Sequence, residues 1–194
     1  ALGPGCGADE AVAAAIRRLV ARVKLPMVVD ADGLNALAGR PDVVREASGP
    51  RVLTPHPGEA ARLLGTTTAD VQADRLGAAR RLAAEWNAVV ALKGARTVVA
   101  APDGRVFLNP TGNPGLASGG SGDVLTGIIG GLLAQRAEPL DATCAGVFVH
   151  GATGDVVAGG SDGRGLAARD LVAALPKTLR RLGAASPANR PKLL

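Results

Sequence analysis

The chain has 194 residues and a mass of 19.3 kDa, which fits one domain with a sizeable buried core. It contains two Phe, one Trp and no Tyr, and this poverty of aromatic rings argues against a surface that binds bases by stacking. The net charge is +5 and the isoelectric point is about 10.0, but the basic residues occur singly or in pairs, so we expect no nucleic-acid partner.

Apolar residues alternate between helical spacing and short β-branched runs, and each change falls at Gly or Pro, which predicts an α/β protein. We expect the strands over 97–101 and 105–108 to form a hairpin at the edge of a mostly parallel sheet, with Trp86 in the core. The predicted elements in chain order are a helix over 8–23, strands over 27–30 and 51–54, helices over 57–64 and 69–86, strands over 88–92, 97–101 and 105–108, and helices over 123–135, 140–157 and 167–182.

The domain organisation, the cysteines and the apolar runs can also be interpreted from the sequence. We expect one domain over residues 1–183 and a flexible polar tail over 184–194. Cys6 and Cys144 are far apart and match no zinc-ligand spacing, so we expect neither a disulfide nor a zinc site, and a reducing cytoplasm fits best. No apolar run is long enough to span a bilayer and no leader precedes the first helix, so we expect no membrane contact.

The first segment with possible chemistry is Gly3-Pro4-Gly5-Cys6-Gly7-Ala8. It can be laid over the dinucleotide-binding glycine pattern, with Asp30 where a ribose-binding acid would stand. That pattern needs a strand before it, and almost nothing precedes Gly3. A Rossmann dehydrogenase is therefore a weak interpretation.

A second segment, the glycine-rich run from Pro114 to Asp123, leads directly into a predicted helix. Closely spaced glycines and a helix N-terminus together indicate an anion site, although no Lys-Ser or Lys-Thr of a Walker loop follows. Asp123 has two interpretations here. It could cap the helix, or it could accept a proton from a substrate hydroxyl that attacks phosphorus.

Three further candidates follow predicted strands. Lys93 begins the segment Lys93–Thr97 at a strand end, where open α/β sheets collect ligands, although an ordinary loop lysine is equally compatible. His56 lies between two prolines that present its ring rigidly, or that simply start a helix. In the segment 30–35, Asp32 could cap a short helix, order Mg²⁺ waters or bind substrate. His150, on an apolar helix, is interpreted as a core histidine.

Taken together, the segments GPGCG (3–7), VDADGLN (29–35), LTPHPGE (53–59), LKGART (92–97) and 113–131 resemble one family. They are similar in type and order to the ADP/ATP-dependent NAD(P)H-hydrate dehydratases of the ribokinase-like superfamily, from the first residues to about Asp155. The resemblance implies a three-layer α/β/α sandwich around a mainly parallel sheet. It also implies repair of NADH hydrate and NADPH hydrate in the cytoplasm, driven by ADP or ATP with Mg²⁺, most often by a homo-oligomer.

The resemblance also implies residue roles. Asp123 would contact the hydrate and act as the base on its hydroxyl, while Gly122, Gly120 and neighbouring amides would hold the transferred phosphate. Gly5 or Gly7 and His56 would contact the hydrate, and Asp32 and Asn35 would also line the substrate site. The AMP part of the nucleotide would be bound by Lys93, Gly94, Ala95, Arg96 and Thr97.

The family's domain ordinarily begins before the GPGCG segment, so we expect this chain to lack the family's N-terminal segment and to expose a sheet edge. Two alternatives remain open. One is a kinase of the same superfamily, of the hydroxymethylpyrimidine or hydroxyethylthiazole type, and the other is an inactive nucleotide-binding module.

Overall fold

A five-stranded sheet forms the centre of the computed structural model, which describes residues 1–184. The strands are β1 (Met27–Val29), β2 (Arg51–Leu53), β3 (Val89–Leu92), β4 (Val98–Ala100) and β5 (Val106–Leu108), and they lie in that order. β1, β2 and β3 are parallel, whereas β4 and β5 are antiparallel to their neighbours. The predicted hairpin at the edge of a mainly parallel sheet is confirmed.

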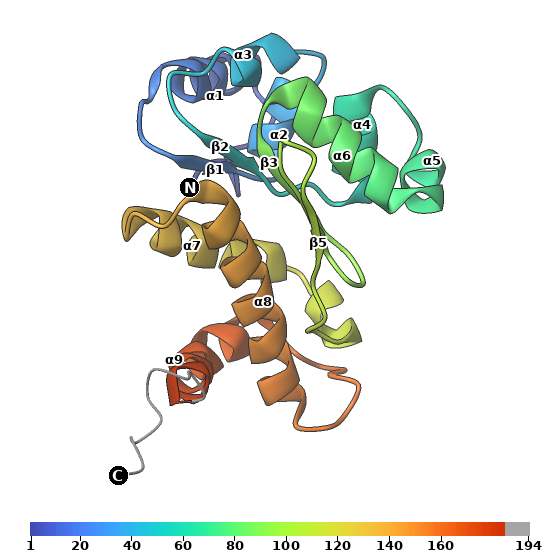
Figure 1. Cartoon of the computed structure of the whole chain (residues 1–194), viewed down its shortest axis with the longest axis vertical. Coiled ribbons are helices and arrows are strands. Elements are labelled where there is room, and N and C mark those ends of the chain that lie inside the picture. Colours follow the sequence, from blue (N-terminus) through green and yellow to red (C-terminus); the bar gives the residue numbers. More distant parts are fainter. Residues whose placement is uncertain (185–194) are drawn as a thin grey trace.

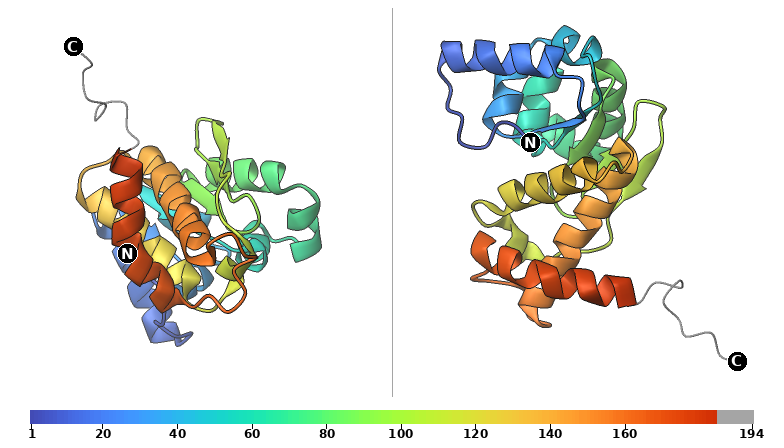
Figure 2. Two further views of the ribbon diagram at one scale, coloured as in Figure 1. Left: turned by 90° about the horizontal axis from the view of Figure 1, so that it is seen from below. Right: turned by 90° about the vertical axis from the view of Figure 1, so that its left-hand side faces the viewer.

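Helices cover both faces of the sheet and make three layers (Figure 1). One layer comprises α1 (Glu10–Arg22), α2 (Asp32–Leu37), α3 (Pro41–Arg45), α4 (Pro57–Leu64), α5 (Thr68–Ala73) and α6 (Arg75–Trp86). The other contains α7 (Ser121–Ala134) and α8 (Pro139–Ala158), and α9 (Ala168–Ala184) packs on α8 away from the sheet (Figure 2). A 3₁₀ turn, η1 (Pro114–Ala117), precedes α7. The predicted three-layer α/β/α sandwich is confirmed.

Alternate residues of β1 to β4 supply the two cores, as the two-residue period of a strand requires. Val29 and Leu53 pack with Trp86 on the α1–α6 side, and Trp86 is a core residue as expected, with 1% of its surface exposed. Val28 and Val52 point to the opposite side, where they pack under α7 and α8. The sheet is therefore covered on both faces, which is typical of parallel sheets.

The single helix predicted over 69–86 is wrong, because Asp74 divides it into α5 and α6. The Asp74 carboxylate accepts a hydrogen bond of 2.8 Å from the amide of Gly77 and so caps α6. An Asp side chain competes with the helical pattern in this way, whereas apolar periodicity continues across the break. The short helix α3 and the turn η1 were not predicted either.

Arg51 ties α1 to the sheet. Its side chain is buried and donates hydrogen bonds to the carbonyls of Val20 and Val23 at the end of that helix, and burial lowers the pKa of its guanidinium. A cation at a helix C-terminus satisfies orphan carbonyls and complements the helix dipole.

Both cysteines are free thiols, as expected. Among residues 1–184, no helix is both long and apolar enough to cross a membrane. The expected tail lies, apart from Ala184 at the end of α9, outside the described residues.

Candidate active site

The predicted site residues gather where β1, β2 and β3 end, because parallel strands bring their carboxyl ends to one edge of the sheet. Asp30 follows β1, the segment Thr54–His56 follows β2, and Lys93 follows β3. The start of α7 reaches the same edge, since Thr126 of this helix donates a hydrogen bond of 2.7 Å to Asp30 Oδ2. Four segments that are distant in sequence therefore meet there.

Lys93 is held rather than free. Its Nζ donates a hydrogen bond of 2.7 Å to Asp30 Oδ1 and lies 3.7 Å from Glu59 Oε2. Asp30 is 1% exposed, and the side chain of Lys93 is 19% exposed. The ordinary loop lysine is therefore excluded, because the ammonium is fixed at the edge of the sheet.

The first turn of α7 presents open amide groups beside this ammonium. Gly120, in the left-handed conformation at φ 80°, is the N-cap, and within residues 1–184 the amides of Gly122 and Asp123 have no hydrogen-bond partner. A Cβ placed on Gly122 would lie 3.4 Å from Lys93 Nζ. The unpartnered amides and the positive end of the helix dipole thus lie close to the ammonium, an arrangement suited to a phosphate group.

Asp123 lies in that first turn and is exposed, and its side chain makes no hydrogen bond or ion pair within the described part of the chain. The capping interpretation is wrong for this residue, because Gly120 takes the N-cap position and no side chain caps the helix. The carboxylate is therefore available to a ligand beside the open amides.

His56 is the N-cap of α4 and is fixed by a reciprocal pair of bonds. Its Nδ1 accepts from the amides of Gly58 at 3.0 Å and Glu59 at 3.2 Å, and the Glu59 carboxylate accepts from the amide of His56 at 2.7 Å. Pro57 occupies the first helical position. The prolines therefore do start a helix, and the ring, which these bonds fix, is also 55% exposed, so both interpretations of this segment hold. Glu59 was missed, although His-x-x-Glu is a variant of the capping box.

The turn Lys93–Thr97 is shaped by an arginine that the sequence did not single out. Arg75 of α6 donates to the carbonyls of Leu92 at 3.1 Å and Lys93 at 3.2 Å, and burial lowers the pKa of its guanidinium. A Cβ on Gly94, whose φ is 137°, would overlap this guanidinium. Gly94, Ala95 and Arg96 are exposed, whereas Thr97 is half-buried and donates to the Gly94 carbonyl at 3.2 Å.

The first loop lies beside the end of β1, because Leu2 bridges to Val29. Gly5 and Gly7 are exposed, with positive φ angles, and the Gly7 amide donates 2.8 Å to Asp32 Oδ2. Asp32 does not cap the following helix, because Ala31 holds the N-cap position, so that alternative is wrong. Its carboxylate fixes the loop instead.

Asn35 is exposed and pairs through its carbonyl oxygen with Arg62, which joins α2 to α4. Nothing in this contact brings Asn35 to Lys93 or to the start of α7.

Two contacts hold the glycine-rich segment on α8. Asp155 accepts hydrogen bonds from the amide of Gly112 at 2.9 Å and from Asn113 Nδ2 at 3.0 Å. His150 Nε2 lies 3.0 Å from the Ser121 carbonyl and 3.1 Å from Ser121 Oγ. His150 is buried, so its interpretation as a core histidine is confirmed, and it anchors the first residue of α7.

The acidic side chains at this edge do not form a metal cage. Within residues 1–184, no group of three or more His, Cys, Asp or Glu side chains could hold a metal ion. Both oxygens of Asp30 are occupied, by Lys93 and by Thr126, and Glu59 is engaged with His56. The donor set therefore does not fit a resident metal, and a magnesium ion here would need ligands from a nucleotide's phosphates.

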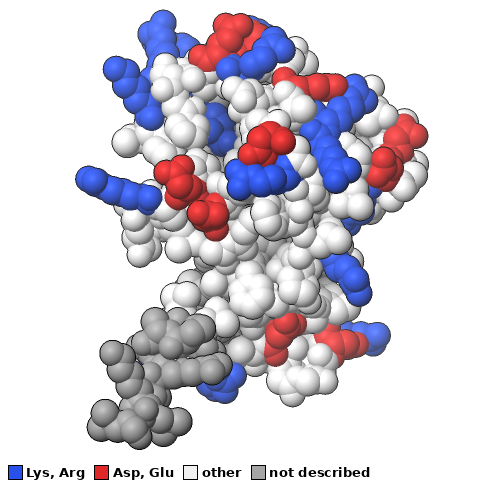
Figure 3. Space-filling view, viewed as in Figure 1, with Lys and Arg blue, Asp and Glu red and all other residues white. Residues whose placement is uncertain are grey.

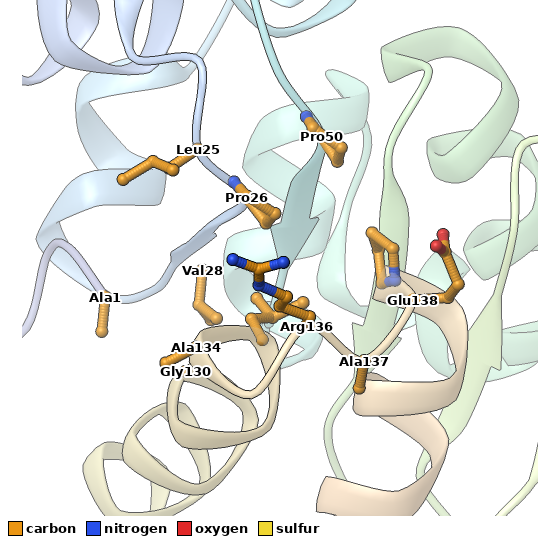
Figure 4. A pocket seen from close by; sticks show the side chains of 12 residues that line it. Ala1, Leu25, Pro26, Val28, Pro50, Gly130, Ala134, Arg136, Ala137 and Glu138 are labelled. Atoms are coloured by element: carbon orange, nitrogen blue, oxygen red, sulfur yellow. The ribbon is translucent and has the colours of Figure 1, made fainter.

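The site is distinct from a cavity of about 660 Å³ at the opposite edge of the sheet (Figure 4). That cavity is lined by residues that precede β1 and β2, such as Pro26 and Pro50, and by Arg136 after α7. None of the candidate residues lines it. On the face shown in Figure 3, Lys and Arg are interspersed with Asp and Glu, as their spacing predicts.

The three-layer sandwich, with the candidate residues at the carboxyl ends of its parallel strands, defines a ribokinase-like α/β protein. The structure matches a ribokinase-like superfamily protein of Enterococcus faecalis over 92% of this chain and 62% of that one, with a TM-score of 0.74 and 29% identity. A family model described as NAD(P)H-hydrate dehydratase matches residues 1–177. The chain belongs to the NAD(P)H-hydrate dehydratase family.

Individual relatives agree with this assignment. The bifunctional NAD(P)H-hydrate repair enzyme Nnr of Moorella thermoacetica is 55% identical over 94% of this chain and 34% of its own length. An ADP-dependent (S)-NAD(P)H-hydrate dehydratase of Neisseria meningitidis is 54% identical over 68% of this chain and 45% of its own. The ADP/ATP-dependent NAD(P)H-hydrate dehydratase of Bacillus subtilis, crystallised with ATP and Mg²⁺, matches 93% of this chain and 63% of its own chain, with a TM-score of 0.84 and 39% identity. The chain thus spans about a third of the bifunctional relative.

Proposed function

We propose that this chain dehydrates NADH hydrate and NADPH hydrate to NADH and NADPH, with ADP as the phosphoryl donor. The observation that carries the proposal is the start of α7, where the amides of Gly122 and Asp123 have no partner within residues 1–184 and Gly122 lies close to the ammonium of Lys93. Family membership supplies the substrate, and the ADP-dependent relative of Neisseria meningitidis favours ADP over ATP.

The reaction divides into two balanced steps. In the first, the hydroxyl of the hydrate attacks the terminal phosphorus of ADP, its proton passes to the carboxylate of Asp123, and AMP leaves. In the second, the C–O bond of the new phosphate ester breaks and inorganic phosphate leaves, while the neighbouring ring carbon gives up a proton to water, and the C–H electron pair forms the restored double bond. Phosphorylation makes a poor leaving group into a good one, and the amides beside Gly122 stabilise the charge on the transferred group.

The remaining site residues have proposed roles around this centre. The exposed turn Lys93–Thr97 would bind the AMP part, with Gly120 and Gly122 at the phosphates. His56 and the loop with Gly5 and Gly7 would contact the hydrate. Asp32 would act by fixing that loop, since its carboxylate binds the Gly7 amide. Asn35 has the weakest support, because it pairs with Arg62.

The metal ion, the oligomeric state and the cellular location are part of the same proposal. Mg²⁺ would enter with the nucleotide and neutralise charge on its phosphates, because no group of three or more ligating side chains is present in residues 1–184 and Asp30 is already paired with Lys93. We also propose that the protein is a homo-oligomer and that it acts in the cytoplasm.

The test is the rise of absorbance in the reduced-nicotinamide band when the chain is mixed with NADH hydrate, Mg²⁺ and either ADP or ATP. We expect a rise that depends on ADP and yields one AMP for each NADH. No rise with either nucleotide would contradict the proposal. Transfer of phosphate to a pyrimidine or thiazole alcohol, with none to the hydrate, would instead favour the kinase.

A further inference from the structure

The buried carboxylate of Asp30 has no role in the proposed chemistry, yet it is the most completely enclosed charge at the site. Both of its oxygens are used, Oδ1 by Lys93 Nζ and Oδ2 by Thr126 Oγ1, each at 2.7 Å. Burying a carboxylate costs free energy. The hydrogen bonds from Lys93 and Thr126 offset this cost only while both donors keep their positions. Asp30 therefore fixes the ammonium between β1, β3 and α7.

The backbone and the side chain of Lys93 lie toward different parts of the site. Its backbone begins the exposed turn that runs to Thr97 and is held by Arg75. Its Nζ turns back to the sheet edge, 3.4 Å from where a Cβ on Gly122 would lie. The ammonium is thus on the side of the open amides, and the backbone is on the side of the turn.

We propose that Asp30 is a positioning residue that aims the Lys93 ammonium at the transferred phosphoryl group, and not at the AMP part of the nucleotide. The inference rests on the proposed function and assigns Lys93 a task separate from the rest of its turn. The contact would be a charge-assisted hydrogen bond to a phosphate oxygen, which strengthens as charge develops on that group.

Removal of the Asp30 carboxylate separates two explanations, because an effect of net charge and an effect on the position of Lys93 would change ADP affinity in opposite directions. The carboxylates of Asp30 and Glu59 outnumber the one ammonium of Lys93, so the net charge of these three side chains by itself does not favour a phosphate. If only net charge mattered, Asp30→Asn would make ADP bind more tightly. If Asp30 acts by aiming the ammonium, the same variant loses affinity for ADP because Lys93 is no longer fixed.

The experiment compares the dissociation constants of AMP and ADP by calorimetry, with Mg²⁺ constant. AMP lacks the phosphoryl group that is transferred, so the ratio of the two constants isolates the contact. We expect Lys93→Met to reduce the preference for ADP by about tenfold and to leave AMP binding within about twofold. Asp30→Asn should reduce the same preference, and the double variant should be no worse than Lys93→Met alone, because one residue acts through the other.

Two controls distinguish the loss of Lys93 positioning from misfolding and from a simple change in net charge. The double variant removes both charges of the pair and is expected to fold even if a single variant leaves the other charge unpaired. Glu59→Gln removes an equal charge whose oxygen is 3.7 Å from Nζ, beyond hydrogen-bond distance, and should leave the preference for ADP unchanged.

The outcomes are distinguishable. Equal weakening of AMP and ADP by Lys93→Met would overturn the inference, because the ammonium would then serve the AMP part. Tighter ADP binding by Asp30→Asn would also overturn it, in favour of net charge. If the wild-type chain bound neither nucleotide, the proposed function would fail and the inference with it.

Discussion

Thr126 of α7 donates a hydrogen bond of 2.7 Å to Asp30 Oδ2 at the end of β1, and both residues are buried. They are 96 positions apart in the sequence. This bond joins the helix that carries the open amides to the sheet that carries the ammonium of Lys93. The start of α7 and the ammonium, which we propose to bind phosphate together, are thereby held in one arrangement.

Replacement of Thr126 by Val should destabilise the protein, because it keeps the shape but leaves a buried carboxylate oxygen without its donor. A buried acceptor left unsatisfied costs about 1–3 kcal/mol, and more when it is charged. Thr126→Ser keeps the hydroxyl and is the matched control. Urea unfolding of both variants measures the difference, and equal stability of Thr126→Val and wild type would refute this role.

Asp123→Asn should abolish turnover and leave nucleotide binding intact. The amide keeps the shape of the side chain but cannot accept the proton of the hydrate's hydroxyl. Because the Asp123 side chain makes no hydrogen bond within the described residues, the substitution should lower the stability by no more than the contribution of about 0.3–1 kcal/mol that a first-turn carboxylate gains from the helix dipole. NADH formation and ADP calorimetry on the same preparation check both statements. Full turnover in the variant would show that the base is another group.

Gly122→Ala should fold normally and lose activity. The added methyl group would lie 3.4 Å from Lys93 Nζ and 3.7 Å from Asp30 Oδ2, which are ordinary contacts, but it would occupy the space assigned to the phosphate. Gly127→Ala on the same helix is the control, because a Cβ there meets nothing within 4 Å. Alanine in place of an exposed helical glycine should add about 0.5–1 kcal/mol of stability.

The comparison of these two variants is decisive for the phosphate space. We expect ADP affinity and NADH formation to fall in Gly122→Ala and to remain at wild-type values in Gly127→Ala. Unchanged ADP binding in Gly122→Ala would mean that the phosphate does not enter the space between the first turn of α7 and Lys93.

The features that the sequence predicted well are those that local chemistry decides. Pro102-Asp103-Gly104 specifies a turn whatever surrounds it, so the hairpin of β4 and β5 could be predicted. The carboxyl ends of parallel strands share one edge, so the meeting of His56 with Lys93 at that edge followed once the sheet was predicted as parallel.

The features that the sequence did not predict depend on contacts between residues distant in sequence, or on a side chain that competes with the backbone hydrogen bonds of a helix. Lys93 and Asp30 are 63 positions apart, and no local pattern tells which carboxylate an ammonium will reach. Arg75 acts on carbonyls of another element in the same way. Asp74 breaks a helix because its side chain replaces a backbone partner, an outcome that apolar spacing does not report.

The buried imidazole of His150 predicts a dependence of stability on pH. Burial lowers the pKa of His150 below its ordinary value of 6.5, and the charge of Lys93 lowers it further, although the bond to the Ser121 carbonyl opposes this. Between the lowered pKa and 6.5, the unfolded chain therefore binds a proton that the folded chain does not. The free energy of unfolding must then fall as pH decreases through this window, with no contribution from His150 to the slope above it.

The effect is isolated by comparing wild type with His150→Gln in urea unfolding between about pH 5 and about pH 8. Carboxylates titrate in both proteins and cancel in the difference, so the variant should show a shallower loss of stability below 6.5. Identical pH slopes in the two proteins would mean that His150 does not exclude the proton in the folded state.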